Sequence, residues 1–310
     1  MVEEIELAHL LPDNQRAVES IRERPSRRYQ FSHFSLPIKA HKHSLFPPLE
    51  GMVWEWRGYD GEAPRSFMSR PVALITGGGR GIGAAASKRL AKDGYDVLLT
   101  YNTSSKPAEM VVEEIRSSGD DALAVKVDCS DSGEVGLLGI HPWMARGIDV
   151  LVLNHGSYER VSADEMTIET LRKTMLTNFE GAVSVWKAVQ PHLTAHARMV
   201  VVGSQLGTKG SPHGADYSAS KAALSTWARS LAQAVGPEGK RVNVLAPGFV
   251  DTAILAGDSS EKRQQREQQV PLQRVGTPED MAGTISFLVG QDSKYITGAI
   301  LHVNGGLYLP

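Results

Sequence analysis

Tyr217 and Lys221 lie four residues apart in the run Asp216-Tyr217-Ser218-Ala219-Ser220-Lys221, whose pattern predicts a helix. Positions i and i+4 share one face of a helix, so the phenol and the ammonium group can reach the same site. A nearby cation favours the phenolate and lowers the pKa of a tyrosine from its ordinary value of about 10. Such a tyrosine can protonate a forming alkoxide. The pair alone is also typical of an exposed helix surface, so other residues must decide.

Two further polar residues could serve the same chemistry. Ser204 follows an apolar run and precedes Tyr217 by thirteen residues (217 − 204 = 13). Its hydroxyl could hold a substrate oxygen. Asn178 lies within a segment that predicts a long helix, where a polar side chain could kink the helix and hold a water.

A glycine-rich loop, Thr76-Gly77-Gly78-Gly79-Arg80-Gly81-Ile82-Gly83, stands between the first apolar run and a helical pattern. Glycines let the backbone approach a pyrophosphate, and a helix N-terminus offers free N–H groups and positive potential. The spacing is G-x-x-x-G-x-G, which differs from the G-x-G-x-x-G dinucleotide fingerprint. The alternative is a purely structural turn, but the position between strand and helix favours a phosphate-binding loop.

The charges near this loop favour NADP(H) over NAD(H). An NAD site usually places an acid at the end of the second strand, to hold the ribose 2′-hydroxyl. Here that strand ends near Asn102, and Asp93 and Asp96 lie at its opposite end. Arg80 could pair with a 2′-phosphate, or it could be a solvated loop charge.

These residues need a scaffold, and the apolar pattern predicts one. Near-continuous apolar runs are typical of strands buried on both faces. They span Val72–Thr76, Val97–Thr100, Leu123–Val127, Val150–Leu153, Met199–Val202, Val242–Leu245 and Ala299–Val303. Helical patterns such as Ile82–Lys92 and Ala108–Ser117 alternate with them. The alternation predicts an α/β fold: a doubly wound, seven-stranded parallel sheet of Rossmann type with right-handed crossovers. Gly136, Gly139 and Pro142 predict a broken or short helix between Asp131 and Asp149.

The pattern changes near residue 70. Residues 1–69 have poor periodicity and are interpreted as an N-terminal extension, poorly ordered or irregularly packed, with an interface arm as the alternative. Residues 70–310 are predicted to form the NADP-binding catalytic domain. The histidines of the extension have no metal-ligand spacing, so no metal site is expected.

Bulk properties exclude several classes. The 310 residues carry a formal net charge of −2, which gives no reason to expect nucleic acid or a membrane surface as partner. The single cysteine, Cys129, is compatible with a reducing compartment. The early acids Glu3, Glu4 and Glu6 argue against organellar import, so a cytoplasmic location is expected.

Residues 71–310 resemble the short-chain dehydrogenase/reductase family, because motifs match in order after five different strands. The resemblance implies an NADP-dependent enzyme acting on CH–OH or C=O groups, with hydride given to a carbonyl carbon and Tyr217 protonating its oxygen. It implies a catalytic tetrad of Asn178, Ser204, Tyr217 and Lys221. It implies cofactor contacts from Gly77, Gly81, Gly83, Asp128, Asn154, Tyr217, Lys221, Val250 and Thr252. Arg80 and Ile82 in the glycine loop and Asn102 at the end of the second strand are also expected to contact the cofactor.

Within the family, residues 270–280, 295–298 and 304–306 are similar to β-ketoacyl-acyl-carrier-protein reductases. This implies a 3-oxoacyl thioester or another small carbonyl compound as substrate, and a homo-oligomer, tetramer or dimer. Gln233 stands where a carrier-docking arginine is expected, which favours a free ketone or coenzyme-A ester over an acyl-carrier protein. His155 replaces a small alanine beside the cofactor, where it could pack, point outward or touch substrate.

Two interpretations of the chain stay open: a catalytic ketoreductase, and a non-catalytic NADP-binding scaffold of the same fold. Non-redox chemistry on this fold is a third. The loop from Thr252 to Thr277 is expected to form a partly apolar lid over the substrate. Its polar run Asp258–Gln269 is interpreted as a solvated helix face.

Overall fold

Seven apolar segments form one parallel sheet within residues 70–310, the part of the chain that this computed structural model describes. Residues 1–69, and the extension predicted there, lie outside the described residues. The strand order is β3-β2-β1-β4-β5-β6-β7, so the predicted doubly wound sheet is confirmed. The strands are β1 Val72–Ile75, β2 Asp96–Tyr101, β3 Ala122–Lys126, β4 Ile148–Leu153, β5 Leu193–Val202, β6 Arg241–Pro247 and β7 Ile300–Val303.

Each face of the sheet carries its own hydrophobic core. Successive side chains of a strand point to opposite faces, and β1 shows this clearly. Val72 and Leu74 belong to one core, while Ala73 and Ile75 belong to the other. Both sets are buried, which is why the strands appear in the sequence as uninterrupted apolar runs.

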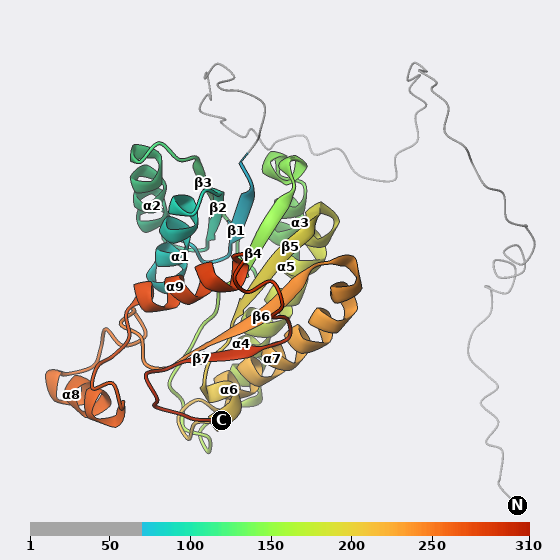
Figure 1. Cartoon of the computed structure of the whole chain (residues 1–310). Helices are drawn as coiled ribbons and strands as arrows, with labels where there is room; N and C mark the ends of the chain where they lie inside the picture. The colour runs from blue at the N-terminus through green and yellow to red at the C-terminus, as the bar shows by residue number, and fades with distance from the viewer. Residues whose placement is uncertain (1–69) are drawn as a thin grey trace, which may run out of the picture. The chain divides into compact units, whose positions relative to one another are not determined.

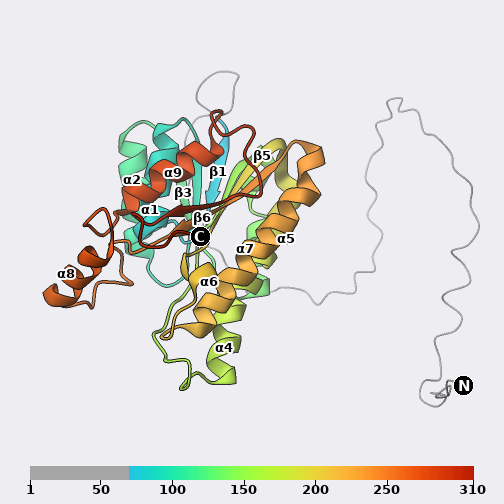
Figure 2. The same ribbon diagram turned by 60° about the horizontal axis from the view of Figure 1, so that its bottom comes forward.

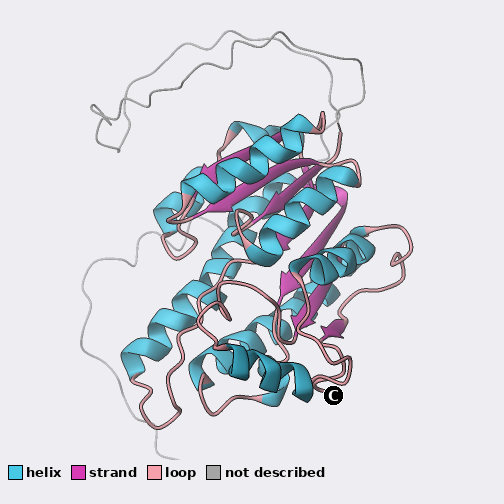
Figure 3. Ribbon diagram, turned by 90° about the vertical axis from the view of Figure 1, so that its left-hand side faces the viewer, coloured by secondary structure: helices cyan, strands magenta, loops and turns pink. Residues whose placement is uncertain are grey.

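Helices cover both faces (Figures 1 and 3). One core contains the apolar sides of three helices: α1 (Gly81–Lys92), α2 (Ser105–Ser117) and α9 (Pro278–Val289). The core on the opposite face contains the apolar sides of α3 (Ser132–Gly139), α5 (Gly181–Val189) and α7 (Ala215–Val235). Three further helices add little to these cores: α4, Ile168–Met175, α6, Leu206–Lys209, and α8, Ser260–Gln269. Figure 2 shows α8 standing away from both layers.

The chain reverses its direction across the sheet at β1 and β4. It leaves β1 towards β2 and β3 on one side, and returns to β4 on the other side of β1. Parallel sheets bind ligands beyond the carboxyl ends of the strands at such a reversal. The glycine loop follows β1 and the Asn154 segment follows β4, so both reach this crevice.

One crossover differs from the prediction of uniform right-handedness. From β4 to β5 and from β5 to β6, the chain moves in one direction across the sheet, and the connecting helices α5 and α7 pack on one face. From β6 to β7 the chain moves in the same direction, but the connecting helix α9 packs on the other face. The connection between β6 and β7 therefore has the opposite hand. The apolar side of α9, which includes Met281, Ile285 and Leu288, packs on the same face of the sheet as α1 and α2.

The helix that follows β3 is short and broken, as the glycines and the proline in this segment predicted. The helix α3 has eight residues, and a separate 3₁₀ turn follows at Pro142–Arg146 with the proline in its first position. By contrast, β5 begins six residues before the predicted Met199 (199 − 193 = 6). Exposed residues such as Ala195 and His196 hide that half of the strand from an apolar pattern. Among residues 70–310, no helix is both long and apolar enough to span a membrane.

Candidate active site

The glycine loop is held open by backbone geometry that side chains would disturb. Gly77 and Gly81 have φ of 62° and 51°, in the left-handed region that favours glycine. A Cβ on Gly83 would lie 2.2 Å from the Gly77 carbonyl oxygen. Asn154 donates from Nδ2 to the carbonyls of Thr76 and Gly77, each at 3.0 Å. This asparagine therefore fixes the loop from the neighbouring strand.

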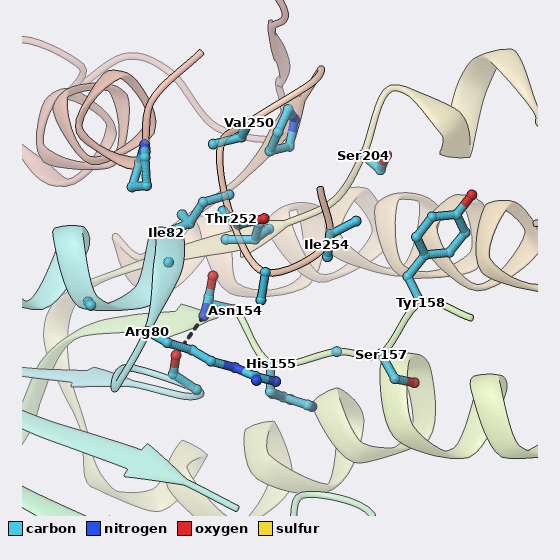
Figure 4. Close-up of a pocket in the computed structure, with 18 of the residues that line it drawn as sticks. Arg80, Ile82, Asn154, His155, Ser157, Tyr158, Ser204, Val250, Thr252 and Ile254 are labelled. Carbon is cyan, nitrogen blue, oxygen red and sulfur yellow. Dashed lines mark hydrogen bonds between the residues drawn. The ribbon is translucent and has the colours of Figure 1, made fainter. Parts of the chain in front are cut away.

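A cleft of about 830 Å³ runs from this loop towards α7. Figure 4 shows Arg80, Asn154 and His155 on one wall, Val250, Thr252 and Ile254 on the other, and Tyr158 and Ser204 at one end. Most of the sequence-predicted site residues line it: Gly77, Arg80, Gly81, Ile82, Asn102, Asp128, Asn154, Ser204, Tyr217, Lys221, Val250 and Thr252. Gly83 and Asn178 stand behind the wall instead, where they shape it through packing and hydrogen bonds.

The end of the cleft near β2 and β3 carries the charges considered for cofactor choice. Arg80 is exposed at the start of α1, and Asn102 is exposed after β2. Asp128 accepts hydrogen bonds from the Ser130 hydroxyl at 2.6 Å and backbone N–H at 2.9 Å. The Ser130 hydroxyl lowers the pKa of Asp128, which keeps this carboxyl ionised.

Ser204, Tyr217 and Lys221 meet at the other end. Ser204 is buried after β5, and its Oγ accepts a hydrogen bond from the Leu206 N–H at 3.1 Å. Lys221 is buried, and its Nζ donates to the Val202 carbonyl at 2.8 Å and lies 5.7 Å from the centre of the Tyr217 ring. The predicted i, i+4 pair therefore faces the cleft and not the solvent.

The pKa of Tyr217 differs in direction from the sequence-based expectation. Burial raises it to about 12, although the Ser204 hydroxyl, which hydrogen-bonds the phenol, lowers it in part. Lys221 does not supply the expected lowering because its ammonium group is directed at the Val202 carbonyl and over the ring face. The phenol therefore stays protonated at neutral pH.

Lys221 should make cofactor affinity depend on pH. Burial lowers the pKa of its ammonium to about 8. If the cation helps to hold a dinucleotide, the Kd for NADPH should rise as pH increases through about 8. The Tyr217→Phe variant should keep this dependence, because the phenol titrates near 12. Fluorescence titration of NADPH from pH 6.5 to 9.5 measures it.

Unfolding would not explain such a loss of affinity. The pKa of Lys221 lies below its ordinary value of 10.5, so the folded protein binds fewer protons than the unfolded chain between about 8 and 10.5. This group therefore adds stability as pH rises through that window. A Kd that stays flat from pH 7 to 9.5 would count against a role for the charged ammonium.

Asn178 lies in a π-helical turn, Leu176–Glu180, that separates α4 from α5. Its amide oxygen accepts from the Ser157 N–H at 2.8 Å, and its Nδ2 donates to the Ser157 carbonyl and to Ser220 Oγ, each at 3.0 Å. The side chain thus ties the loop after β4 to α7. Because both amide hydrogens are used, a water at this residue would have to donate to an oxygen.

His155 is fixed rather than directed outward. Its Nδ1 lies 2.7 Å from the Thr76 hydroxyl, and its Nε2 is buried without a hydrogen-bond partner among the described residues. Burial lowers the pKa of His155 to about 4, so the ring is neutral at physiological pH. Cys129 nearby is also buried, and burial raises the pKa of its thiol to about 12.

Sequence reasoning missed several residues of the cleft. Tyr158 places its ring 4.6 Å from that of Tyr217 and donates its hydroxyl to the His213 carbonyl at 2.8 Å. Arg160 and Arg266 also line the cleft. The run Ser157-Tyr158-Glu159-Arg160, directly after the Asn154 motif, was the available signal for two of them. No local pattern distinguishes Arg266 from its polar neighbours in α8.

Comparison with known proteins identifies the family to which this fold belongs. Residues 77–308 match the family model described as enoyl-(acyl carrier protein) reductase. The chain is 36% identical to an uncharacterized oxidoreductase of Methylorubrum extorquens, over 78% of this chain and 99% of that one. It is 34% identical to the 3-oxoacyl-[acyl-carrier-protein] reductase FabG of Staphylococcus aureus, over 76% and 98%.

A solved structure gives the same result. The short-chain dehydrogenase from Burkholderia cenocepacia, determined in complex with NADP, superposes with a TM-score of 0.72 at 36% identity, over 76% of this chain and 97% of that one. The chain therefore belongs to the short-chain dehydrogenase/reductase family.

Proposed function

We propose that this protein reduces a ketone, a 3-oxoacyl thioester or another small carbonyl compound, to the secondary alcohol, with Tyr217 as the proton donor. The observation that carries the proposal is that Ser204, Tyr217 and Lys221 share one cleft with the glycine loop. The S. aureus relative is named for reduction of a 3-oxoacyl group, which supports the thioester as a substrate class.

The chain is an NADP-dependent oxidoreductase that acts on CH–OH and C=O groups. The cleft fits the dinucleotide, because the loop forms a cradle that a side chain would fill: a Cβ on Gly81 would lie 3.2 Å from Thr252 Cγ2. The exposed Arg80 offers a cation for a 2′-phosphate, and no acid ends β2. When bound, the cofactor supplies the hydride.

In the proposed reaction, side chains of the protein bind and protonate the carbonyl oxygen of the substrate. Ser204 Oγ accepts the Leu206 N–H, which orients the hydroxyl, and a bound substrate would receive the Ser204 proton at its carbonyl oxygen in place of the phenol. Tyr217 is protonated at neutral pH and gives its proton to that oxygen as negative charge develops. Lys221, held by the Val202 carbonyl, places a positive charge behind the phenol, and Asn178 fixes the Ser157 loop beside it.

Arg80 should decide the preference for the phosphorylated cofactor. Replacing it with glutamine removes a charge-assisted hydrogen bond, worth about 1.5 to 3 kcal/mol, and should raise the Kd for NADPH about 10-fold or more while the Kd for NADH changes little. The matched control is Arg89→Gln in α1, the helix that Arg80 precedes, which breaks an ion pair with Asp93. Equal effects on both cofactors would contradict this assignment.

The activity itself is tested by following NADPH oxidation at 340 nm with β-ketoacyl thioesters, cyclic ketones, quinones and sugars. We expect turnover of at least one ketone class. NADPH binding without turnover of any class would favour the scaffold alternative. Coenzyme-A and carrier-protein esters should be compared, since Gln233 is an uncharged, exposed residue of α7. We also propose a homo-oligomer, a tetramer or dimer, which light scattering measures directly.

A further inference from the structure

Two arginines that line the cleft meet at one carboxylate that is largely covered from solvent. Arg160 belongs to the loop after β4, and Arg266 belongs to α8. Arg266 donates to Asp258 from Nε at 2.5 Å and from Nη2 at 3.3 Å, while Arg160 Nη1 lies 3.5 Å from the same carboxylate. Both arginines line the cleft, whereas the Asp258 side chain is 6% exposed and lies behind them.

This cluster has an excess of positive charge. Arg160, Arg266 and Lys262 all contact Asp258, which gives three cations to one carboxylate, a net charge of +2 (3 − 1). Asp251, an acid of the neighbouring wall, is already paired with Arg263 at 2.8 Å. Of this cluster only Arg160 and Arg266 line the cleft, so the charge that the cluster presents there is positive.

The two guanidinium groups keep hydrogen-bond donors for a ligand. A guanidinium has five N–H donors in a planar fork. Arg266 uses two of these donors on Asp258, one from Nε and one from Nη2, which leaves three. Its guanidinium carbon lies 4.5 Å from the centre of the Phe249 ring. Arg160 makes only one long contact with Asp258, so most of its donors stay available. A planar fork of this kind suits carboxylate and phosphate oxygens.

The cluster is close to the proposed site of reduction. Tyr158, whose ring lies 4.6 Å from that of Tyr217, precedes Arg160 by two residues. Two residues of extended chain span at most about 7 Å. A substrate whose carbonyl oxygen meets Tyr217 can therefore extend a second functional group towards Arg160.

We propose that Arg160, supported by Arg266, binds an oxyanion of the substrate, a carboxylate or a phosphate, and so gives this reductase a preference for anionic ketones. Arg160 is the specificity-determining residue of the pair, because Arg266 is committed to Asp258. This inference rests on the proposed ketone reduction. It also corrects the interpretation of Asp258–Gln269 as merely a solvated face: most of α8 is exposed, but Asp258 and Arg266 turn inward.

The test compares matched ketones that differ in one charge. Levulinate and levulinamide form the carboxylate pair, and dihydroxyacetone phosphate and dihydroxyacetone form the phosphate pair. We expect the wild-type kcat/KM to favour one anionic ketone at least about 10-fold over its neutral partner, mainly through KM. Arg160→Gln should lower that ratio about 10-fold, and Arg160→Lys should restore part of it. The pair that shows the effect identifies the anion.

The control is Arg116→Gln, which removes an exposed arginine of α2 outside the cleft and should leave the ratio unchanged. A purely structural Arg160 would lower kcat/KM equally for both members of a pair, which overturns the proposal, as does a wild type without preference. Calorimetric binding of levulinate and of dihydroxyacetone phosphate needs no turnover. Arg160-dependent binding without reduction would therefore reject the proposed function alone.

Discussion

Replacing Tyr217 with phenylalanine is expected to lower kcat about 10²- to 10⁴-fold, the usual contribution of a general acid, while the Kd for NADPH changes little. The variant removes the hydroxyl that Ser204 contacts but keeps the ring that lies beneath the Lys221 ammonium group. Single-turnover reduction of the best ketone measures the chemical step, and fluorescence titration measures binding.

Tyr158 offers a matched control for this experiment. Its ring contacts that of Tyr217, but its hydroxyl already donates to the His213 carbonyl. Tyr158→Phe should therefore cost much less in kcat, although both variants lose one phenolic hydroxyl from the same end of the cleft. If Tyr158→Phe abolished turnover and Tyr217→Phe did not, the proton donor would have been assigned to the wrong tyrosine.

Gly83→Ala is expected to damage both the fold and the cofactor site. The new Cβ would lie 2.2 Å from the Gly77 carbonyl oxygen and 2.6 Å from Asn154 Nδ2, so the loop and its anchoring hydrogen bonds must shift. Overpacking typically costs about 1 to 3 kcal/mol, and because this clash is with a backbone oxygen we expect a cost above the gain of about 1 kcal/mol from alanine in a helix. Chemical denaturation and NADPH titration measure the two effects.

Gly283→Ala is the matched control, because Gly283 also lies in a helix, α9, and its added Cβ would meet nothing within 4 Å. It should stabilise the protein by up to about 1 kcal/mol. The two substitutions are chemically identical and should have opposite signs. A Gly83→Ala protein as stable as the wild type, with normal NADPH affinity, would show that the loop tolerates a side chain at this point.

Much of the scaffold could be predicted because its signals are local. The strands are buried on both faces, so Val72–Ile75 and its counterparts are apolar at every position and easily recognised. Glycines and a proline marked the break at Pro142 for an equally local reason. The exposed beginning of β5 and the hand of the last crossover depend on which surfaces pack together, and no short window of sequence contains that information.

The chemistry of the site could likewise be predicted only in part. The spacing of Tyr217 and Lys221 and the glycines before α1 indicated which groups could act, because helix periodicity and backbone freedom are properties of the chain itself. The direction of the tyrosine pKa was not predictable, because it depends on burial and on a lysine whose ammonium group is held by the Val202 carbonyl of another element.

The sequence by itself determined the order of strands and helices, the glycine loop and the residue types that could donate a proton or hold a phosphate. Only the tertiary structure decided that Arg160 and Arg266, 106 residues apart (266 − 160 = 106), line one cleft and share Asp258 as a partner. Electrostatic interactions act through space over a few ångströms, and folding alone brings such distant side chains within that range.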